Sequence, residues 1–295
     1  MHVLVTGGTG FVGTALCREL AERGHEVTAL SRSADGTTVP EGVEPYRGDV
    51  TDYESIEGAF EGQDAVVNLV ALSPLFQPKS GENEHFRIHL GGTENAVRAA
   101  EEHGVERFVQ QSALGADPDG PTHYLRSKGD AEAVVRDSAL DWTILRPSII
   151  FGEAAEIVDF TKLLTTPYVT GLPNGGRIPF QPIWLDDFDS IVAETLDDDA
   201  HVGEVYELGG PEVLTLADIT RLIYRAEGKS VSILPIPLAL AKVGGTVAGP
   251  LPLIPFGSDQ IAALGVDNTV ADNDVTAFGL DPAELRTFGD YLGVA

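Results

Sequence analysis

The sequence predicts an α/β protein with a doubly wound parallel sheet and a smaller C-terminal lobe. Short apolar runs alternate with segments of helical periodicity through the first half of the 295-residue chain. A glycine-rich turn follows the first apolar run, and the alternation ends near residue 147, where Pro and Gly become frequent. Strict alternation of this kind is typical of parallel strands joined by helices that cover both faces of a sheet.

The elements of the first half follow one another in a regular order. The expected strands are residues 2–6, 27–30, 43–46, 65–71, 107–112 and 142–145. The expected helices between them are residues 11–23, 52–60, 83–103 and 124–138. The nearly continuous apolar run at 65–71 is expected to be a strand buried on both faces. After residue 147 we expect helices over 186–196 and 215–227, and a strand at 205–208 that could rejoin the sheet.

The charge of the chain is strongly negative. Lys and Arg total 19 against 46 Asp and Glu, which gives a net charge of −27 and a pI of about 4.4. Such a surface repels phosphate backbones, so we expect no nucleic-acid partner. Acidic, lysine-poor surfaces suit a very salty cytosol, where dense screening removes the self-repulsion. We therefore expect a halophilic source; the alternative is simply an acidic protein.

Cysteine content and apolar patterning indicate the compartment. Cys17 is the only cysteine, so no intrachain disulfide can form, and a reducing compartment is expected. A strand that starts at residue 2 leaves no room for a signal peptide. The longest apolar stretch, residues 233–256, contains prolines, glycines and Lys242, and would break as a membrane-spanning helix. We therefore expect a cytoplasmic protein.

The turn after the first strand satisfies the G-x-G-x-x-G pattern. It comprises Gly7, Gly8, Thr9, Gly10, Phe11, Val12 and Gly13. With a strand before it and a helix after it, such a turn lets backbone N–H groups approach a pyrophosphate at the helix N-terminus. The alternative is a generic glycine turn. We predict a Rossmann-type dinucleotide-binding domain over residues 1–147 and a substrate or partner lobe over 148–295.

The end of the second strand predicts which form of the dinucleotide binds. Enzymes for the non-phosphorylated cofactor usually place Asp or Glu there, whereas this chain has Ser31 and Arg32. A guanidinium can pair with a 2′-phosphate, so NADP(H) is the expected cofactor. Arg32 could instead be a solvated surface residue, and NAD(H) would bind if Asp35 turned inward. Asp49 is predicted to reach the adenine amino group; its alternative role is that of a turn residue.

Tyr124 and Lys128 are four residues apart in an expected helix, which puts their side chains on one face. A phenol has a pKa of about 10, so it must be activated to act as an acid–base catalyst at neutral pH. A neighbouring ammonium does so by stabilising the phenolate. Ser112, at the end of the fifth strand, could hold a substrate oxygen beside Tyr124. Because Y-x-x-x-K is common by chance, its place after the dinucleotide-binding half supports the prediction.

These motifs resemble the short-chain dehydrogenase/reductase superfamily, of the extended or atypical kind that includes nucleotide-sugar epimerases. The resemblance extends to residues 48–50, 65–71, 91–95, 146–148 and 184–188. It implies that Ser112 polarises the substrate, that Tyr124 is the acid/base, and that Lys128 grips the nicotinamide ribose and tunes Tyr124. We also expect the cofactor to contact Val50, Val70, Ala71, Pro147 and Ser148. No metal site is expected.

Within that superfamily the chain is most similar to the nucleotide-binding accessory subunit of respiratory complex I and its free-standing prokaryotic relatives. This similarity is carried by four stretches, residues 112–116, 124–128, 234–237 and 267–268. That subunit binds NADPH tightly and is not established as a catalyst. His89 stands where the superfamily usually has the Asn of a proton relay, so His could substitute or the relay could be absent.

The sequence therefore leaves two functions open. The first is an NADP(H)-dependent oxidoreductase, a reductase or dehydrogenase of a small carbonyl or alcohol, with Tyr124 as acid/base. The second is a non-catalytic NADPH-binding accessory or assembly protein. Residues 233–256 are either a pair of short helices on the substrate pocket or an apolar surface. Such a surface could dock on a respiratory complex or on the inner face of a membrane. The short separation of Ser112 from Tyr124 argues against sugar-nucleotide epimerisation.

Overall fold

A computed structural model describes residues 1–237, 258–263 and 265–294 of the chain. The chain divides into two compact units. The first contains residues 1–72, 80–146 and 185–206, and the second contains the remainder. Each unit is described by itself below.

Seven strands form the central sheet, in the order β11-β6-β5-β4-β1-β2-β3. Their bounds are β1 His2–Thr6, β2 Glu26–Ser31, β3 Glu44–Arg47, β4 Ala65–Asn68, β5 Arg107–Gln111, β6 Asp141–Pro147 and β11 Val205–Leu208. Every pairing among β1 to β6 is parallel, and β1 pairs with both β2 and β4. The predicted doubly wound sheet is confirmed, including the late strand that rejoins it. In such sheets a ligand binds where the strand order reverses, at the carboxyl ends of β1 and β4.

The fourth strand is shorter than the apolar run predicted. β4 ends at Asn68, and the expected continuation over 69–71 is wrong. The reason lies in the neighbouring strand: Asn68 is the register partner of Thr6, the last residue of β1. Beyond Asn68, β4 has no residue of β1 to pair with. The chain leaves the sheet after one last bond, from the Leu69 N–H to the Thr6 carbonyl at 3.1 Å.

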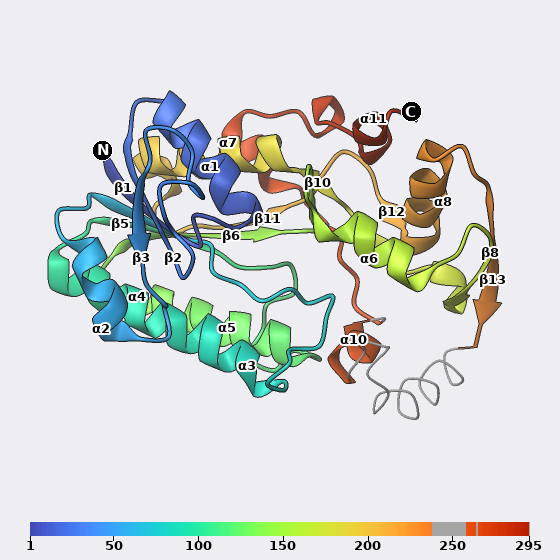
Figure 1. The fold of residues 1–295 in the computed structure, drawn as a ribbon, viewed down its shortest axis with the longest axis horizontal. Coiled ribbons are helices and arrows are strands. Elements are labelled where there is room, and N and C mark those ends of the chain that lie inside the picture. Colours follow the sequence, from blue (N-terminus) through green and yellow to red (C-terminus); the bar gives the residue numbers. More distant parts are fainter. Residues whose placement is uncertain (238–257, 264, 295) are drawn as a thin grey trace. The chain divides into compact units, whose positions relative to one another are not determined.

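Helices cover both faces of this sheet, with α1 and α7 on one face and α2, α4 and α5 on the other (Figure 1). Their bounds are α1 Phe11–Glu22, α2 Tyr53–Ile56, α3 Asn83–His85, α4 Gly91–His103, α5 His123–Arg136 and α7 Leu185–Asp197. The 3₁₀ turn η1 (Glu57–Phe60) continues α2, as the predicted helix over 52–60 requires. The predicted helix over 83–103 is present, but a π-helical turn, η2 (Phe86–Leu90), interrupts it between α3 and α4.

The core between the sheet and the second helical layer is apolar and fully buried. Its members include Leu4, Val66, Phe108 and Ile144 from the strands, and Phe60, Ala96, Ala100 and Val135 from the helices. Small residues let α4 approach closely: a Cβ added at Gly92 would lie only 2.8 Å from the Val50 side chain. The start of α4, and with it the π-helical turn, is therefore held against the loop that follows β3.

The second unit is built from short elements. Three two-stranded sheets pair β7 (Ile150–Phe151) with β10 (Ile183–Trp184), β8 (Tyr168–Pro173) with β13 (Val231–Ile236), and β9 (Pro179–Phe180) with β12 (Leu214–Thr215). The helices are α6 Glu156–Leu164, α8 Leu216–Ala226, α10 Ser258–Ala263 and α11 Phe288–Leu292. α8 begins with a capping box between Thr215 and Asp218, which confirms the predicted helix there.

Of the two alternatives for residues 233–256, a pair of short helices or an apolar surface, the helices are wrong for the first residues. Residues 233–236 belong to β13, which runs parallel to β8 with Val231 opposite Tyr168. Pro235 suits such a ribbon, because among the described residues each strand is paired along one edge only, and the other edge needs no N–H donor. Residues 238–256 lie outside the described part of the chain. Within the described ranges, we find no helix with the length and apolar content needed to cross a bilayer.

The carboxyl group of Asp189, on α7, is buried. Asp189 is 3% exposed, and its Oδ1 has no hydrogen-bond partner among the described residues. Burial raises the pKa of this carboxyl to about 8, and the charges of Asp186 and Glu19 add to the effect. Folding therefore takes up a proton between the unfolded pKa, 3.8, and the folded one. The stability contribution of Asp189 declines as the pH rises through that window.

We expect Asp189→Asn to raise the melting temperature by several degrees at pH 8, because the amide carries no ionisation penalty. Ionising the buried Asp189 carboxyl lowers the free energy of unfolding by about a few kcal/mol at that pH. Thermal unfolding of both proteins from pH 4.5 to pH 8.5 tests this, with Asp197→Asn, a more exposed carboxyl on α7, as the control. A difference between Asp189→Asn and the parent that stays constant across this range would contradict the buried-acid account.

Candidate active site

The glycine turn is shaped by backbone contacts that side chains would block. Gly7 adopts a φ of +77°, and the N–H groups of Gly7 and Gly8 donate to the Leu30 carbonyl at 2.8 and 3.3 Å. A Cβ added at Gly13 would lie 2.2 Å from the Gly7 carbonyl oxygen, so α1 can start here only with glycine. The N-cap of α1 is Gly10, which has no side chain that could bond to the first N–H groups of the helix. The N–H groups of the first helical turn are thus available to an anion.

Hydroxyl groups gather beside the carboxyl end of β2. Thr9 Oγ1 lies 2.7 Å from Ser31 Oγ and 3.3 Å from Ser33 Oγ. Arg32, between the two serines, is exposed. Hydroxyl donors next to a guanidinium are the groups that bind a phosphate ester. This end of the strand therefore has the chemistry that a 2′-phosphate requires.

The two acidic residues predicted near the adenosine are engaged in their own turns. Asp35 Oδ1 accepts bonds from the Thr37 hydroxyl and N–H at 2.6 and 2.8 Å, which hold the pKa of the Asp35 carboxyl below its ordinary value. Asp49 Oδ1 accepts from the Thr51 N–H and hydroxyl at 3.0 and 2.9 Å. Burial opposes ionisation of Asp49, yet these bonds and the charge of Arg32 keep its pKa low. Asp35 and Asp49 are thus held by bonds within their own turns.

A chain of buried hydrogen bonds crosses three strands below the site. Thr6 Oγ1 donates to Asn68 Oδ1 at 2.5 Å, and Asn68 Nδ2 donates to Gln110 Oε1 at 2.8 Å. Gln110 Nε2 then donates to the Gln111 carbonyl at 3.0 Å, and Lys128 Nζ donates to the same carbonyl at 3.0 Å. The strand that carries the glycine turn is thereby connected to Lys128 through side chains with defined orientation.

The predicted catalytic residues lie on β5 and α5. Ser112 follows β5 directly, and its Oγ is buried with no hydrogen-bond partner among the described residues. Lys128 is 1% exposed, and burial lowers the pKa of its ammonium to about 8. Burial also raises the pKa of the Tyr124 phenol, which is therefore protonated at neutral pH. This pair presents a phenolic proton donor and a charged ammonium on one helix face.

The segment between Ser112 and Tyr124 is packed tightly on α5. A Cβ added at Gly129 would lie 2.4 Å from the Asp117 carbonyl carbon. Arg146 donates to the Ala116 carbonyl at 3.2 Å and pairs with Glu132, a buried carboxylate on α5, at 2.7 Å. This short segment is therefore held close to the helix.

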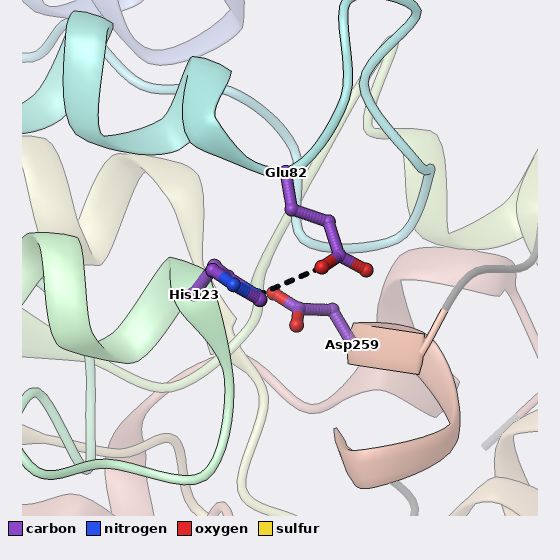
Figure 2. Close-up of side chains that lie close together, drawn as sticks. All are labelled: Glu82, His123 and Asp259. Carbon is purple, nitrogen blue, oxygen red and sulfur yellow. Dashed lines mark ion pairs between the residues drawn. The ribbon is translucent and has the colours of Figure 1, made fainter.

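Two histidines that face Tyr124 come from α3 and the π-helical turn. The His85 and His89 rings lie 5.8 and 5.4 Å from the Tyr124 ring, both nearly perpendicular to it. Sequence reasoning noted His89 as a departure and missed His85, whose spacing of four residues from His89 was the available signal. Ahead of α3, Glu82 pairs with His123 at 3.2 Å, at the start of α5 (Figure 2). Asp259, also drawn there, belongs to the second unit.

The remaining residues predicted to contact the cofactor fall in both units. The backbone after β4 passes the glycine turn, since a Cβ added at Gly7 would lie 3.4 Å from the Val70 nitrogen. Ala71 is exposed beside it, and Val50 is buried after β3. Pro147 and Ser148 open a segment of the second unit, where Ser148 Oγ lies 2.7 Å from Asn268 Oδ1.

Comparisons with known proteins agree with this geometry. A family model described as NAD(P)H-binding matches residues 7–165. The mitochondrial NADH dehydrogenase [ubiquinone] 1 alpha subcomplex subunit 9 of Arabidopsis thaliana is 31% identical, over 96% of this chain and 75% of the plant subunit. The NAD(P)H azoreductase of Xenophilus azovorans is 25% identical, over 98% of this chain and 96% of its own.

A solved structure shows the same fold. UDP-glucose 4-epimerase of Thermus thermophilus, in complex with NAD, superposes with a TM-score of 0.74 at 23% identity, over 100% of this chain and 97% of the epimerase. The sequence relatives support an NAD(P)-dependent oxidoreductase and confirm the resemblance to the complex I subunit, whereas the epimerase structure shows the shared fold. With its glycine turn and its match over more than half of its length, the chain belongs to the NAD(P)H-binding family.

Proposed function

We propose that the chain is an NADP(H)-dependent reductase or dehydrogenase of a small carbonyl or alcohol. The observation that carries this proposal is that Tyr124 and Lys128 lie one turn apart on α5, and that the Ser112 hydroxyl, directly after β5, has no partner among the described residues. A binding protein that never turns over its cofactor has no need of a proton donor, a buried cation and a hydroxyl donor of this kind. The azoreductase similarity supports a redox role.

The chain's residues divide the work of carbonyl reduction. Backbone N–H groups at Phe11 and Val12, in the first turn of α1, would hold the pyrophosphate. When bound, the cofactor supplies the hydride that reaches the carbonyl carbon. Ser112 donates a hydrogen bond to the carbonyl oxygen, and Tyr124 Oη delivers its proton to the same oxygen. Lys128 supplies the positive charge that stabilises the phenolate left behind.

We assign to Arg32 the binding of the 2′-phosphate of NADP(H). We expect Arg32→Ala to weaken NADPH binding by about 10- to 100-fold, because a charge-assisted pair is lost, and to leave NADH binding within about twofold. Titration of nicotinamide fluorescence measures both affinities. Arg18→Ala, at an exposed arginine of α1, is the charge-matched control. Equal loss of NADPH and NADH affinity in Arg32→Ala would contradict the assignment.

A second candidate function is supported by one comparison. The plant subunit that is 31% identical to this chain is named as part of NADH dehydrogenase. In that role the chain would hold NADPH without turnover and would dock on a partner complex, at the inner face of the membrane, through residues 233–256. Residues 233–236 of that stretch belong to β13, which pairs with β8.

One assay separates the two functions. The full chain is incubated with NADPH and, in turn, small quinones, aldehydes and ketones, and oxidation is followed at the nicotinamide absorbance. We expect multiple turnovers per chain with at least one of these acceptors. Stoichiometric NADPH binding with no consumption in any reaction would overturn the reductase and leave the accessory role.

A further inference from the structure

Both ring nitrogens of His89 are occupied by bonds within the first unit. Nε2 lies 2.9 Å from the Leu72 backbone nitrogen, and Nδ1 lies 2.8 Å from Ser127 Oγ. Ser127 Oγ in turn lies 2.8 Å from the Tyr124 carbonyl oxygen. His89 itself is 1% exposed and stands in the π-helical turn, a conformation that is rare and often found at functional sites.

These bonds determine which nitrogen carries the proton. An amide N–H can only donate, so the Leu72 bond requires an unprotonated Nε2 on His89. A carbonyl can only accept, so the single hydroxyl proton of Ser127 goes to Tyr124, and His89 Nδ1–H donates to Ser127 Oγ. The ring is therefore the neutral Nδ1–H tautomer. Burial and the nearby charge of Lys128 keep it neutral by lowering the pKa of His89 well below its ordinary value.

We propose that His89 is a positioning residue that fastens the segment after β4 to the catalytic helix α5. That segment carries Val70 and Ala71, which pass the glycine turn, and α5 carries Tyr124 and Lys128. With both nitrogens bonded, His89 has no free site for a proton-relay water. Instead it fixes the distance between the segment beside the glycine turn and the helix that carries the proton donor. This inference rests on the proposed function of the same site.

Three substitutions separate positioning from a relay. In His89→Gln, the amide oxygen reaches the place of Nε2 and can still accept from Leu72. In His89→Asn, the side chain restores the residue usual in the superfamily but reaches only the place of Nδ1. His89→Phe keeps the ring contact with Tyr124 and loses both bonds. Each protein is titrated with NADPH and with 2′,5′-ADP, which lacks the nicotinamide, and the fluorescence of bound NADPH is recorded.

We expect His89→Gln to bind NADPH within about threefold of the parent. His89→Asn and His89→Phe should lose about tenfold, the cost of leaving the half-buried Leu72 amide unpaired. All three should bind 2′,5′-ADP like the parent, because the adenosine end is untouched. Any assayed turnover should follow the same order, through kcat more than KM.

The inference is overturned if His89→Asn matches the parent while His89→Gln fails, since this order is that of a relay. It is equally overturned if all three variants bind NADPH like the parent with unchanged fluorescence and differ only in melting temperature, since the role would then be purely structural. Failure of the parent chain to bind NADPH would instead refute the proposed function, so the two failures are distinguishable.

Discussion

Tyr124→Phe should reduce NADPH-dependent turnover by about 10³-fold, within the range that general acid–base groups contribute. The substitution removes only the phenolic oxygen, while the ring keeps its contacts with His85 and His89. Without the proton from Oη, hydride addition to a carbonyl would leave an alkoxide with no positioned donor. Steady-state rates with the best acceptor found for the parent chain provide the measurement.

The control for this substitution is the affinity for NADPH. Tyr124→Phe should bind NADPH within about threefold of the parent, because the phenol contributes to chemistry more than to cofactor binding. Tyr168→Phe, at a tyrosine that is 65% exposed in the second unit, should leave both rate and affinity unchanged. Full activity in Tyr124→Phe would exclude this tyrosine as the proton donor.

Gly13→Ala should abolish dinucleotide binding at micromolar concentrations, a loss of about 100-fold or more. The added Cβ would lie 2.2 Å from the Gly7 carbonyl oxygen and 2.7 Å from Gly8 Cα, so the turn must open. Opening moves the N–H groups that would hold the pyrophosphate. Isothermal titration with NADPH measures the loss.

Gly36→Ala is the matched control, because nothing lies within 4 Å of a Cβ added there. It should bind NADPH like the parent chain. Circular dichroism of Gly13→Ala establishes that the chain still folds. A folded Gly13→Ala protein with parental NADPH affinity would show that this turn does not bind the dinucleotide.

The parts of the site that the sequence could predict are those fixed by short-range geometry. The glycine turn joins a strand and a helix that are adjacent in the chain, so its pattern of small residues describes it completely. Tyr124 and Lys128 share a face because of helical periodicity alone. The turn at Asp49 follows the third strand directly in the sequence, so it too could be predicted from local pattern.

The parts that escaped prediction depend on contacts between distant residues. β4 ends at Asn68 because β1 runs out of partners at Thr6, which the apolar run at 65–71 cannot express. The π-helical turn could not be predicted, because the spacing of apolar residues over 83–103 is typical of an uninterrupted helix. The bonds of His89 join it to Leu72 and Ser127, which lie 17 and 38 residues away. The lowered pKa of Lys128 depends on burial, which only the packed unit defines.

The identity of the bound dinucleotide tests the central claim most directly. The purified full chain is equilibrated with equimolar NADP and NAD, exchanged into volatile buffer and weighed by native mass spectrometry. We predict one added mass per chain, that of NADP, as the Thr9, Ser31 and Arg32 group requires. A complex with NAD alone, or no complex at all, would contradict the account.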